Sequence, residues 1–140
     1  RFRESDIRAM GRGATGVKAM RLRKDDHVVG LNIIAAAGED QKAELLVVME
    51  QGFGKKTPIK EYKRQRRGGS GLKTAKITPK NGAVVSTKII KDEAELVAIS
   101  QKGQVIRTGL ADVPTLGRAT QGVRIMRLAS GDKVASSTTL

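Results

Sequence analysis

A basic, glycine-rich segment at residues 65–71 (QRRGGSG) combines two residue types that can bind phosphate groups. Glycine can adopt positive φ angles and lets the backbone approach a ligand closely, and a guanidinium can bind a phosphate through two parallel hydrogen bonds. Related segments occur at residues 11–16 and 117–122, and in each of the three an arginine lies four residues before a glycine, as Arg12 does before Gly16. The pattern predicts a contact with a polyanion that is repeated along the chain.

Basic residues also recur at fixed positions around these segments. Matching positions lie 55 residues apart between the first and second copies and 51 apart between the second and third. The aligned basic sets are Arg1, Lys56 and Arg107; Lys18, Lys73 and Arg124; and Arg21, Lys76 and Arg127. Repetition at a fixed spacing suits a curved DNA path, and ordinary solvated strand faces are the alternative.

The charge of the chain narrows the class of partner. Twenty-seven Lys and Arg residues against fourteen Asp and Glu residues give a net charge of +13. Residues 55–76 carry nine basic side chains and one acidic one. This excess points to a nucleic acid or an anionic surface. If six to ten of these groups meet phosphates, affinity is expected to fall roughly 10³–10⁵-fold between 50 and 200 mM salt. Aromatic residues make up only 2% of the chain, which argues against single-strand binding by base stacking.

Alternating apolar and polar residues with glycine turns predict an all-β fold. Residues 44–49 and 95–99, each followed by a glycine and a second strand, are typical of β-hairpins. Further strands are predicted at 17–22, 28–34, 72–77, 83–90, 123–128 and from 134 onward, and Asn81-Gly82 is the strongest hairpin signal. A short helical turn within 57–63 is the one alternative to strand structure.

Four short strands in a unit of about 50 residues are typical of propeller blades. We therefore predict a single repeat domain over 1–140, with blade-like repeats at about 1–42 (partial), 43–93 and 94–140. The chain begins with Arg1 and not with methionine, which predicts a fragment or a processed product.

Catalytic and cofactor chemistry has little support in the residue pattern. His27 is the only histidine and has no second ligand pattern, so no metal site is predicted. Tyr62 occupies an apolar position of the repeat, opposite Ile7 and Val113, and is expected to pack. No serine or threonine has a histidine and carboxylate to activate it, and no phosphate-binding lysine motif of nucleotide hydrolases occurs. We predict no catalytic residue, no cofactor and no membrane partner, the last because no apolar run approaches the length of a spanning helix.

Several separated motifs resemble one family. They are Gly52-Phe53-Gly54-Lys55-Lys56-Thr57-Pro58 followed by Glu61-Tyr62, the loop Arg67-Gly68-Gly69-Ser70-Gly71, Phe2 with Val17-Lys18, and the stretch 117–124 (GRATQGVR). With these, essentially the whole chain resembles the C-terminal DNA-wrapping domain of the A subunit of bacterial DNA gyrase. The resemblance implies a six-bladed β-pinwheel with a basic outer rim, of which this chain would supply the last three four-stranded blades. The related domain of topoisomerase IV is similar but more degenerate, so the regular repeats favour gyrase.

The family's defining box, QRRGGKG, is matched by residues 65–71 at six of seven positions, with Ser70 in place of lysine. The flanks of the segment match the fifth blade and not the first, where the box normally lies. We interpret the segment as a sibling of the box.

Together, charge, repeats and resemblance predict a non-catalytic module of a type IIA topoisomerase that binds and bends duplex DNA to support negative supercoiling. The implied partners are double-stranded DNA and the remainder of the gyrase A and B subunits, with a homodimer completing a six-bladed disc as a further option; the implied location is the cytoplasm, at the nucleoid. The alternative is a basic module that binds protein or RNA, whereas an enzyme in its own right is disfavoured. The predicted DNA-binding residues are Arg1, Arg12, Lys18, Arg21, Lys55, Lys56, Lys63, Arg64, Gln65, Arg66, Arg67, Gly68, Gly69, Ser70, Gly71, Lys73, Lys76, Arg107, Arg118, Arg124 and Arg127.

Overall fold

The computed structural model describes residues 1–34 and 42–140. The chain divides into two compact units, one made of Arg1–His27 with Tyr62–Leu72 and the other of Val28–Glu61 with Lys73–Leu140. Each unit is described by itself. Over the described ranges, no helix is long and apolar enough to cross a membrane.

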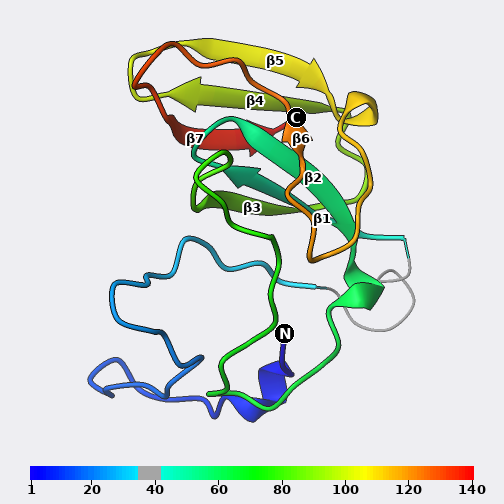
Figure 1. Ribbon diagram of the computed structural model, residues 1–140. Coiled ribbons are helices and arrows are strands. Elements are labelled where there is room, and N and C mark those ends of the chain that lie inside the picture. The colour runs from blue at the N-terminus through cyan, green and yellow to red at the C-terminus, as the bar shows by residue number, and fades with distance from the viewer. Residues whose placement is uncertain (35–41) are drawn as a thin grey trace. The chain divides into compact units, whose positions relative to one another are not determined.

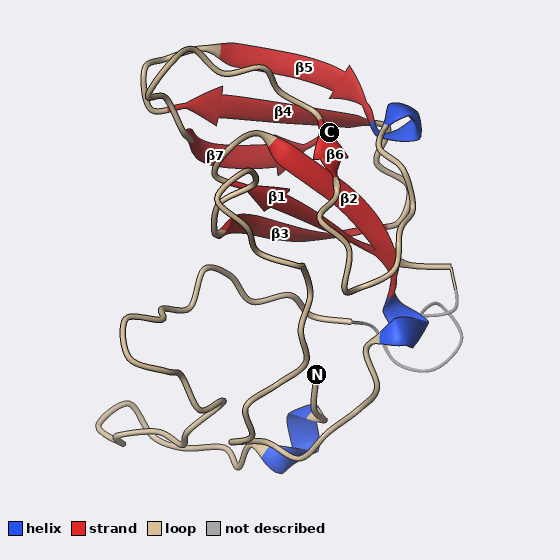
Figure 2. Cartoon of the chain, in the orientation of Figure 1, coloured by secondary structure: helices blue, strands red, loops and turns tan. Residues whose placement is uncertain are grey.

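The second unit holds all the strands found among the described residues (Figures 1 and 2). The strands are β1 (Glu44–Met49), β2 (Phe53–Pro58), β3 (Val84–Ile90), β4 (Glu95–Ser100), β5 (Val105–Gly109), β6 (Val123–Arg124) and β7 (Val134–Thr139), with 3₁₀ turns η3 (Ile59–Glu61) and η4 (Leu110–Asp112). They form a four-stranded sheet in the order β3-β1-β2-β6 and a three-stranded sheet in the order β5-β4-β7. All paired strands are antiparallel. The predicted all-β class is confirmed.

Both predicted hairpins form. Strand β1 pairs with β2 and β4 pairs with β5, and each connection contains a glycine with positive φ, +74° at Gly52 and +86° at Gly103. These angles are ones that other L-residues rarely adopt, which is why glycine marks the two turns in the sequence. The predicted helical turn also forms, as η3 directly after Pro58.

The fourth strand of the larger sheet comes from the last repeat. Strand β6 pairs with β2, so that Arg124 lies opposite Phe53 and Val123 opposite Gly54. The approach is close, because a Cβ atom on Gly122 would lie 2.7 Å from the carbonyl oxygen of Gly54. The sheet of the middle repeat is therefore completed by a strand that the following repeat donates.

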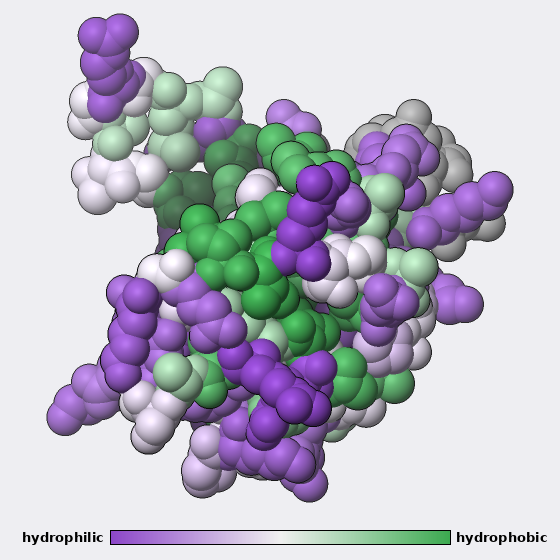
Figure 3. All heavy atoms as spheres, turned by 90° about the horizontal axis from the view of Figure 1, so that it is seen from above, coloured by the Kyte–Doolittle hydropathy of each residue, from purple (hydrophilic) through white to green (hydrophobic). Residues whose placement is uncertain are grey.

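An aliphatic core joins the two sheets. Buried Leu46 and Val48 of β1 belong to the same cluster as Leu96 and Ala98 of β4, with Met126 beside them. A second cluster on the other face of the larger sheet contains Val47, Met49, Phe53 and Ala75. In the space-filling view from above, apolar side chains are visible among hydrophilic ones (Figure 3). The burial of alternate residues on both faces of β1 fixes the register of the sheet.

Several predicted strands do not form. Residues 17–22, 28–34 and 72–77 lie outside regular strands, and within 123–128 only Val123–Arg124 is one. By the rule that β6 follows, 72–73 would pair with the first repeat's equivalent of Phe53, and the 55-residue offset places that position outside this sequence. Segment 28–34 likewise has no counterpart of β1 to pair with.

Individual contacts still hold two of these segments in place. Asn32 donates from Nδ2 to Thr87 Oγ1 in β3 at 2.9 Å. Lys76 N–H donates to the carbonyl oxygen of Thr120 at 3.0 Å. The turn predicted at Asn81-Gly82 does form, with a φ of +70° at Gly82, but only β3 follows it and no strand precedes it.

The first unit consists mainly of extended segments and loops, with one 3₁₀ turn, η1 (Glu4–Asp6). Backbone hydrogen bonds between its two parts substitute for a sheet. The unit is thus built around the glycine-rich segment 65–71 and the stretch that contacts it.

Candidate nucleic-acid interface

The QRRGGSG loop is held against the N-terminal stretch by backbone hydrogen bonds. Gln65 N–H donates to the carbonyl oxygen of Arg1 at 2.9 Å. Gly68 N–H donates to Ala19 O at 2.8 Å, with Gly68 at a φ of +80°. The loop in turn accepts a hydrogen bond at Gly69 O from Arg21 N–H, also at 2.8 Å. The loop therefore has a defined backbone shape, and its glycines serve that shape.

The two arginines of the loop have different surroundings. Arg67 is half-buried and donates from Nε to Asp6 O at 3.0 Å and from Nη1 to Lys18 O at 2.6 Å. Arg66 is exposed and makes no hydrogen bond or ion pair within the described part of the chain. The phosphate contact predicted for Arg67 needs correction, because its guanidinium is committed to two backbone carbonyls. Arg66 keeps a free guanidinium.

The last repeat uses the same contacts at the aligned positions. Arg118 donates from Nη1 to Lys73 O at 3.0 Å, as Arg67 does to Lys18. Leu116 N–H donates to Lys56 O at 2.8 Å, and Lys76 N–H donates to Thr120 O at 3.0 Å. These two bonds match Gln65 with Arg1 and Arg21 with Gly69. The repeated arginine is thus a structural clamp between a loop and the basic segment that precedes it by about 50 residues.

Lys55 is also not where the sequence places it. Its side chain is fully buried, and Nζ donates to Gly117 O at 2.6 Å, Arg118 O at 2.7 Å and Thr120 Oγ1 at 3.1 Å. Burial lowers the pKa of Lys55, and the Glu61 carboxylate opposes that shift. The predicted DNA contact of Lys55 is wrong, because the ammonium is enclosed by the 117–122 loop.

Two further side chains fix this loop. Glu61 accepts a hydrogen bond at Oε2 from Arg118 N–H at 3.0 Å. Asn81, which is fully buried, donates from Nδ2 to Gln121 O at 3.1 Å and to Lys76 O at 2.9 Å. A loop with so many internal contacts presents its side chains in set directions.

Most of the predicted basic residues are exposed. The exposed ones are Arg1, Arg12, Lys18, Arg21, Lys63, Arg64, Arg66, Lys73, Lys76, Arg107, Arg124 and Arg127, with Gln65, Gly69, Ser70 and Gly71 also exposed in the loop. Gly68 is half-buried. Lys56 pairs with Glu44 at 3.5 Å and is only 15% exposed, and Arg107 pairs with Glu95. These two pairs reduce the positive charge that either residue offers to a ligand.

Two basic residues that the sequence reasoning left out lie beside predicted ones. Lys80 and Arg124 both lie over the Phe53 ring, at 5.7 Å and 5.5 Å from its centroid. Arg23 is exposed two residues after Arg21. The i to i+2 spacing of the two arginines was the available signal, since alternate residues of an extended segment point the same way.

The described residues contain no group of three or more His, Cys, Asp or Glu side chains that could hold a metal ion. Tyr62 is half-buried, and His27 is exposed.

The two sheets, the donated strand and the repeated clamped loops define a propeller-type repeat protein whose loops carry basic side chains. The family model described as "DNA gyrase C-terminal domain, beta-propeller" matches residues 1–35, 43–91 and 94–138, and the chain belongs to this family.

Individual relatives agree with this assignment. The DNA gyrase A subunit of Staphylococcus epidermidis is 45% identical over 136 residues, which are 97% of this chain and 15% of that protein. A solved structure of a DNA gyrase A C-terminal domain matches with a TM-score of 0.81 and 26% identity, over 99% of this chain and 45% of that one. The C-terminal domain of a DNA topoisomerase IV has the same fold, with a TM-score of 0.88 at 19% identity over 99% of this chain and 42% of that one. The chain thus spans a small part of its curated gyrase relative.

Proposed function

We propose that this chain is a non-catalytic module that binds duplex DNA through its exposed basic side chains and bends it. Its membership of the gyrase C-terminal family supports the proposal, and one structural observation carries it. The aligned residues Lys18, Lys73 and Arg124 are all exposed, and each directly follows the aliphatic residue after a repeat glycine. Cations at a fixed repeat spacing suit a continuous phosphate backbone.

The contacts proposed are to phosphates and not to base edges. The basic side chains project from loops and short extended segments, and the described residues present no helix suited to the major groove. Phosphate contacts fix position, while base contacts specify sequence. Binding is therefore expected to be strongly salt-dependent and to vary with the ease of bending the DNA more than with its sequence.

The wider setting follows from the relatives and is part of the proposal. The module acts within a type IIA topoisomerase, attached to the remainder of the gyrase A subunit and working with the B subunit at the bacterial nucleoid in the cytoplasm. DNA cleavage and ATP hydrolysis belong to other parts of that enzyme. Bending by the module would favour the wrap that negative supercoiling requires. A second copy of this chain completing the disc is the alternative way to close the repeat array.

The first test is a salt-titrated binding curve with a duplex of about 40 base pairs that carries a fluorescence pair at its ends. The expected result is a steep fall in affinity with salt, together with increased energy transfer as the ends approach. Binding without increased transfer would remove bending from the proposal. Absence of salt-sensitive duplex binding would overturn it and favour a protein- or RNA-binding module.

A triple variant tests which cations take part. Lys18→Gln, Lys73→Gln and Arg124→Gln together are expected to lower the slope of log affinity against log salt by about 2.7, since each lost phosphate contact contributes about 0.9. The matched control removes the same charges at exposed positions outside the aligned set, with Arg8→Gln, Lys24→Gln and Lys60→Gln. Equal losses in the two variants would mean that net charge, and not the repeat spacing, governs binding.

A further inference from the structure

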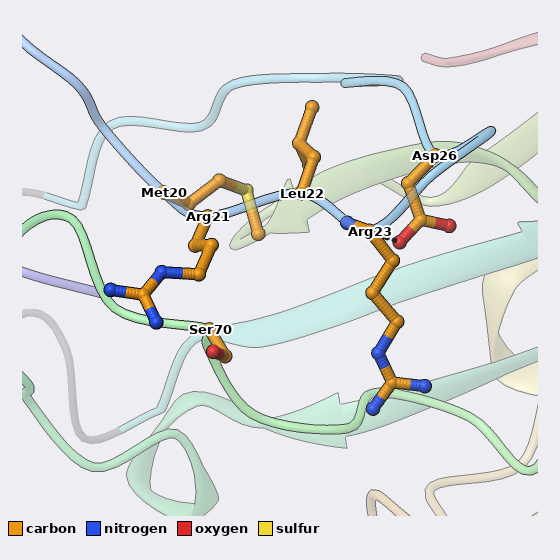
Figure 4. A pocket seen from close by; sticks show the side chains of 6 residues that line it. All are labelled: Met20, Arg21, Leu22, Arg23, Asp26 and Ser70. Carbon is orange, nitrogen blue, oxygen red and sulfur yellow. Dashed lines mark hydrogen bonds between the residues drawn. The ribbon is translucent and has the colours of Figure 1, made fainter.

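A small hollow in the first unit lies where the N-terminal stretch contacts the QRRGGSG loop. Its lining residues are Met20, Arg21, Leu22, Arg23, Asp26 and Ser70. Figure 4 shows that Arg21 and Arg23 extend to the same side of their segment and flank Ser70, whereas Leu22 points away from it. Two guanidinium groups and a hydroxyl therefore border one small space.

None of these three groups has a partner within the described part of the chain. The guanidinium groups of Arg21 and Arg23 make no hydrogen bond or ion pair there, and neither does the Ser70 hydroxyl. This contrasts with Arg67, whose guanidinium donates to two backbone carbonyls. The hollow thus combines unsatisfied hydrogen-bond donors with two positive charges.

The backbone fixes the places of these donors. Arg21 N–H donates to Gly69 O at 2.8 Å, which ties the arginine segment to the residue before Ser70. Gly71, on the other side of Ser70, has a φ of +76°, an angle that turns the chain away after the serine. The donors are positioned before a ligand arrives, which lowers the entropy cost of binding.

Asp26 is the one acidic group at the hollow, and it has a local role. Its Oδ2 accepts a hydrogen bond from Arg23 N–H at 3.2 Å, and its own N–H donates to Arg23 O at 3.2 Å. The carboxylate closes the turn at 23–26 and leaves a net charge of about +1 in the hollow.

The other repeats lack this combination. The positions aligned with Arg21, Arg23 and Ser70 are Lys76, Thr78 and Gln121 in the next pair of segments. There the Thr78 hydroxyl already contacts Asn81 Oδ1 at 3.1 Å. In the last repeat the arginine pair is reduced to Arg127, with Ala129 in the second position. The twin-arginine hollow is specific to the QRRGGSG loop.

We propose that Arg21, Arg23 and Ser70 form a seat for one phosphate of the DNA backbone. This proposal rests on the duplex binding proposed above and adds Arg23 and a defined geometry to it. A phosphate offers several acceptor oxygens, and guanidinium groups bind such oxygens through charge-assisted hydrogen bonds. Ser70, which stands where the family box has lysine, supplies a neutral donor in a site that already has two cations.

The test compares Arg23→Gln with Lys24→Gln in the same salt titration of the 40-base-pair duplex. Both variants remove one exposed positive charge from adjacent positions, but only Arg23 lines the hollow. Arg23→Gln is expected to lower the salt slope by about 0.9 and the affinity several-fold, whereas Lys24→Gln leaves both close to the parent values. Ser70→Ala is expected to lower the affinity without changing the slope. Identical behaviour of Arg23→Gln and Lys24→Gln would overturn the proposal.

Inorganic phosphate separates failure of this site from failure of the proposed function. Its binding is followed by NMR through the Nε–H signals of Arg21 and Arg23. Saturable shifts that Arg23→Gln abolishes and Lys24→Gln leaves intact support the seat even if the parent chain fails to bind duplex DNA. If duplex DNA binds normally but these signals do not respond to phosphate or to DNA, the seat is disproved while the proposed function stands. Equal denaturation midpoints of the two variants exclude a folding effect.

Discussion

The guanidinium of Arg67 donates a hydrogen bond from Nη1 to the carbonyl oxygen of Lys18 across 2.6 Å. The equivalent bond in the next repeat joins Arg118 to Lys73. In both cases the arginine that resembles a phosphate ligand in the sequence instead holds the backbone of a basic residue. The side chains of Lys18 and Lys73 stay exposed as a result. The repeat thus uses one cation as a clamp and leaves another facing solvent.

The two arginines of the QRRGGSG loop are expected to separate in their effects. Arg67→Ala should lower the free energy of unfolding by about 1–3 kcal/mol, because it removes charge-assisted hydrogen bonds to two carbonyls. Arg66→Ala should leave stability unchanged and lower the salt slope of duplex binding by about 0.9. Urea denaturation and the salt titration measure the two quantities. If Arg66→Ala also destabilises the chain, or if Arg67→Ala alone changes the slope, the division of roles is wrong.

Lys55→Met is expected to destabilise the chain by about 2–3 kcal/mol, because the substitution keeps most of the side-chain volume but leaves buried oxygens of Gly117, Arg118 and Thr120 without their donor. Lys60→Met removes the same charge from an exposed position and should have little effect. Chemical denaturation of the two variants gives the comparison. Equal stability would show that the loop does not depend on the buried ammonium.

Gly52→Ala is expected to cost more than about 2 kcal/mol of stability, because backbone strain and a steric clash add together. Its φ is +74°, and an added Cβ would overlap the carbonyl oxygen of Met126, close to the donated strand. Gly103→Ala is the matched control, because Gly103 has a φ of +86° but no atom within 4 Å of the added Cβ. The control should show the backbone strain alone, about 1 kcal/mol. Thermal or urea unfolding distinguishes the two, and similar losses would argue against close packing at Gly52.

Glu50 should make stability depend on pH in the acid range. A hydrogen bond from Ala83 N–H at 3.0 Å lowers the pKa of Glu50 below its ordinary value of 4.5, against the opposing effect of burial, and the Lys133 ammonium at 3.3 Å lowers it further. Because the folded pKa is depressed, this stabilisation is complete above pH 4.5 and is lost as the pH falls through the folded value. Glu50→Gln should therefore destabilise by about 1 kcal/mol at neutral pH and by less near pH 3. A difference in unfolding free energy that stays constant between these pH values would contradict the assignment.

Local signals in the sequence predicted the elements that local physics controls. Gly52 and Gly103 mark hairpins because their φ angles exclude most other residues, and the apolar runs beside them form β1 and β4. The 55- and 51-residue offsets also aligned the loops correctly, since Arg67 and Arg118 make the same contact. The resemblance to the gyrase family was confirmed by the matching family model.

By itself, then, the sequence determined the all-β class, the hairpins and the excess of positive charge, because turn angles, alternation and net charge are properties of neighbouring residues or of composition. Only the tertiary structure decided that β6 completes the sheet of another repeat, that Lys55 is buried, and that Arg67 holds a loop while Arg66 and Arg23 face solvent. Two adjacent arginines or lysines are equivalent when charges are counted. Which of them is buried depends on segments about 50 residues away, and only folding brings those carbonyl oxygens within hydrogen-bonding distance.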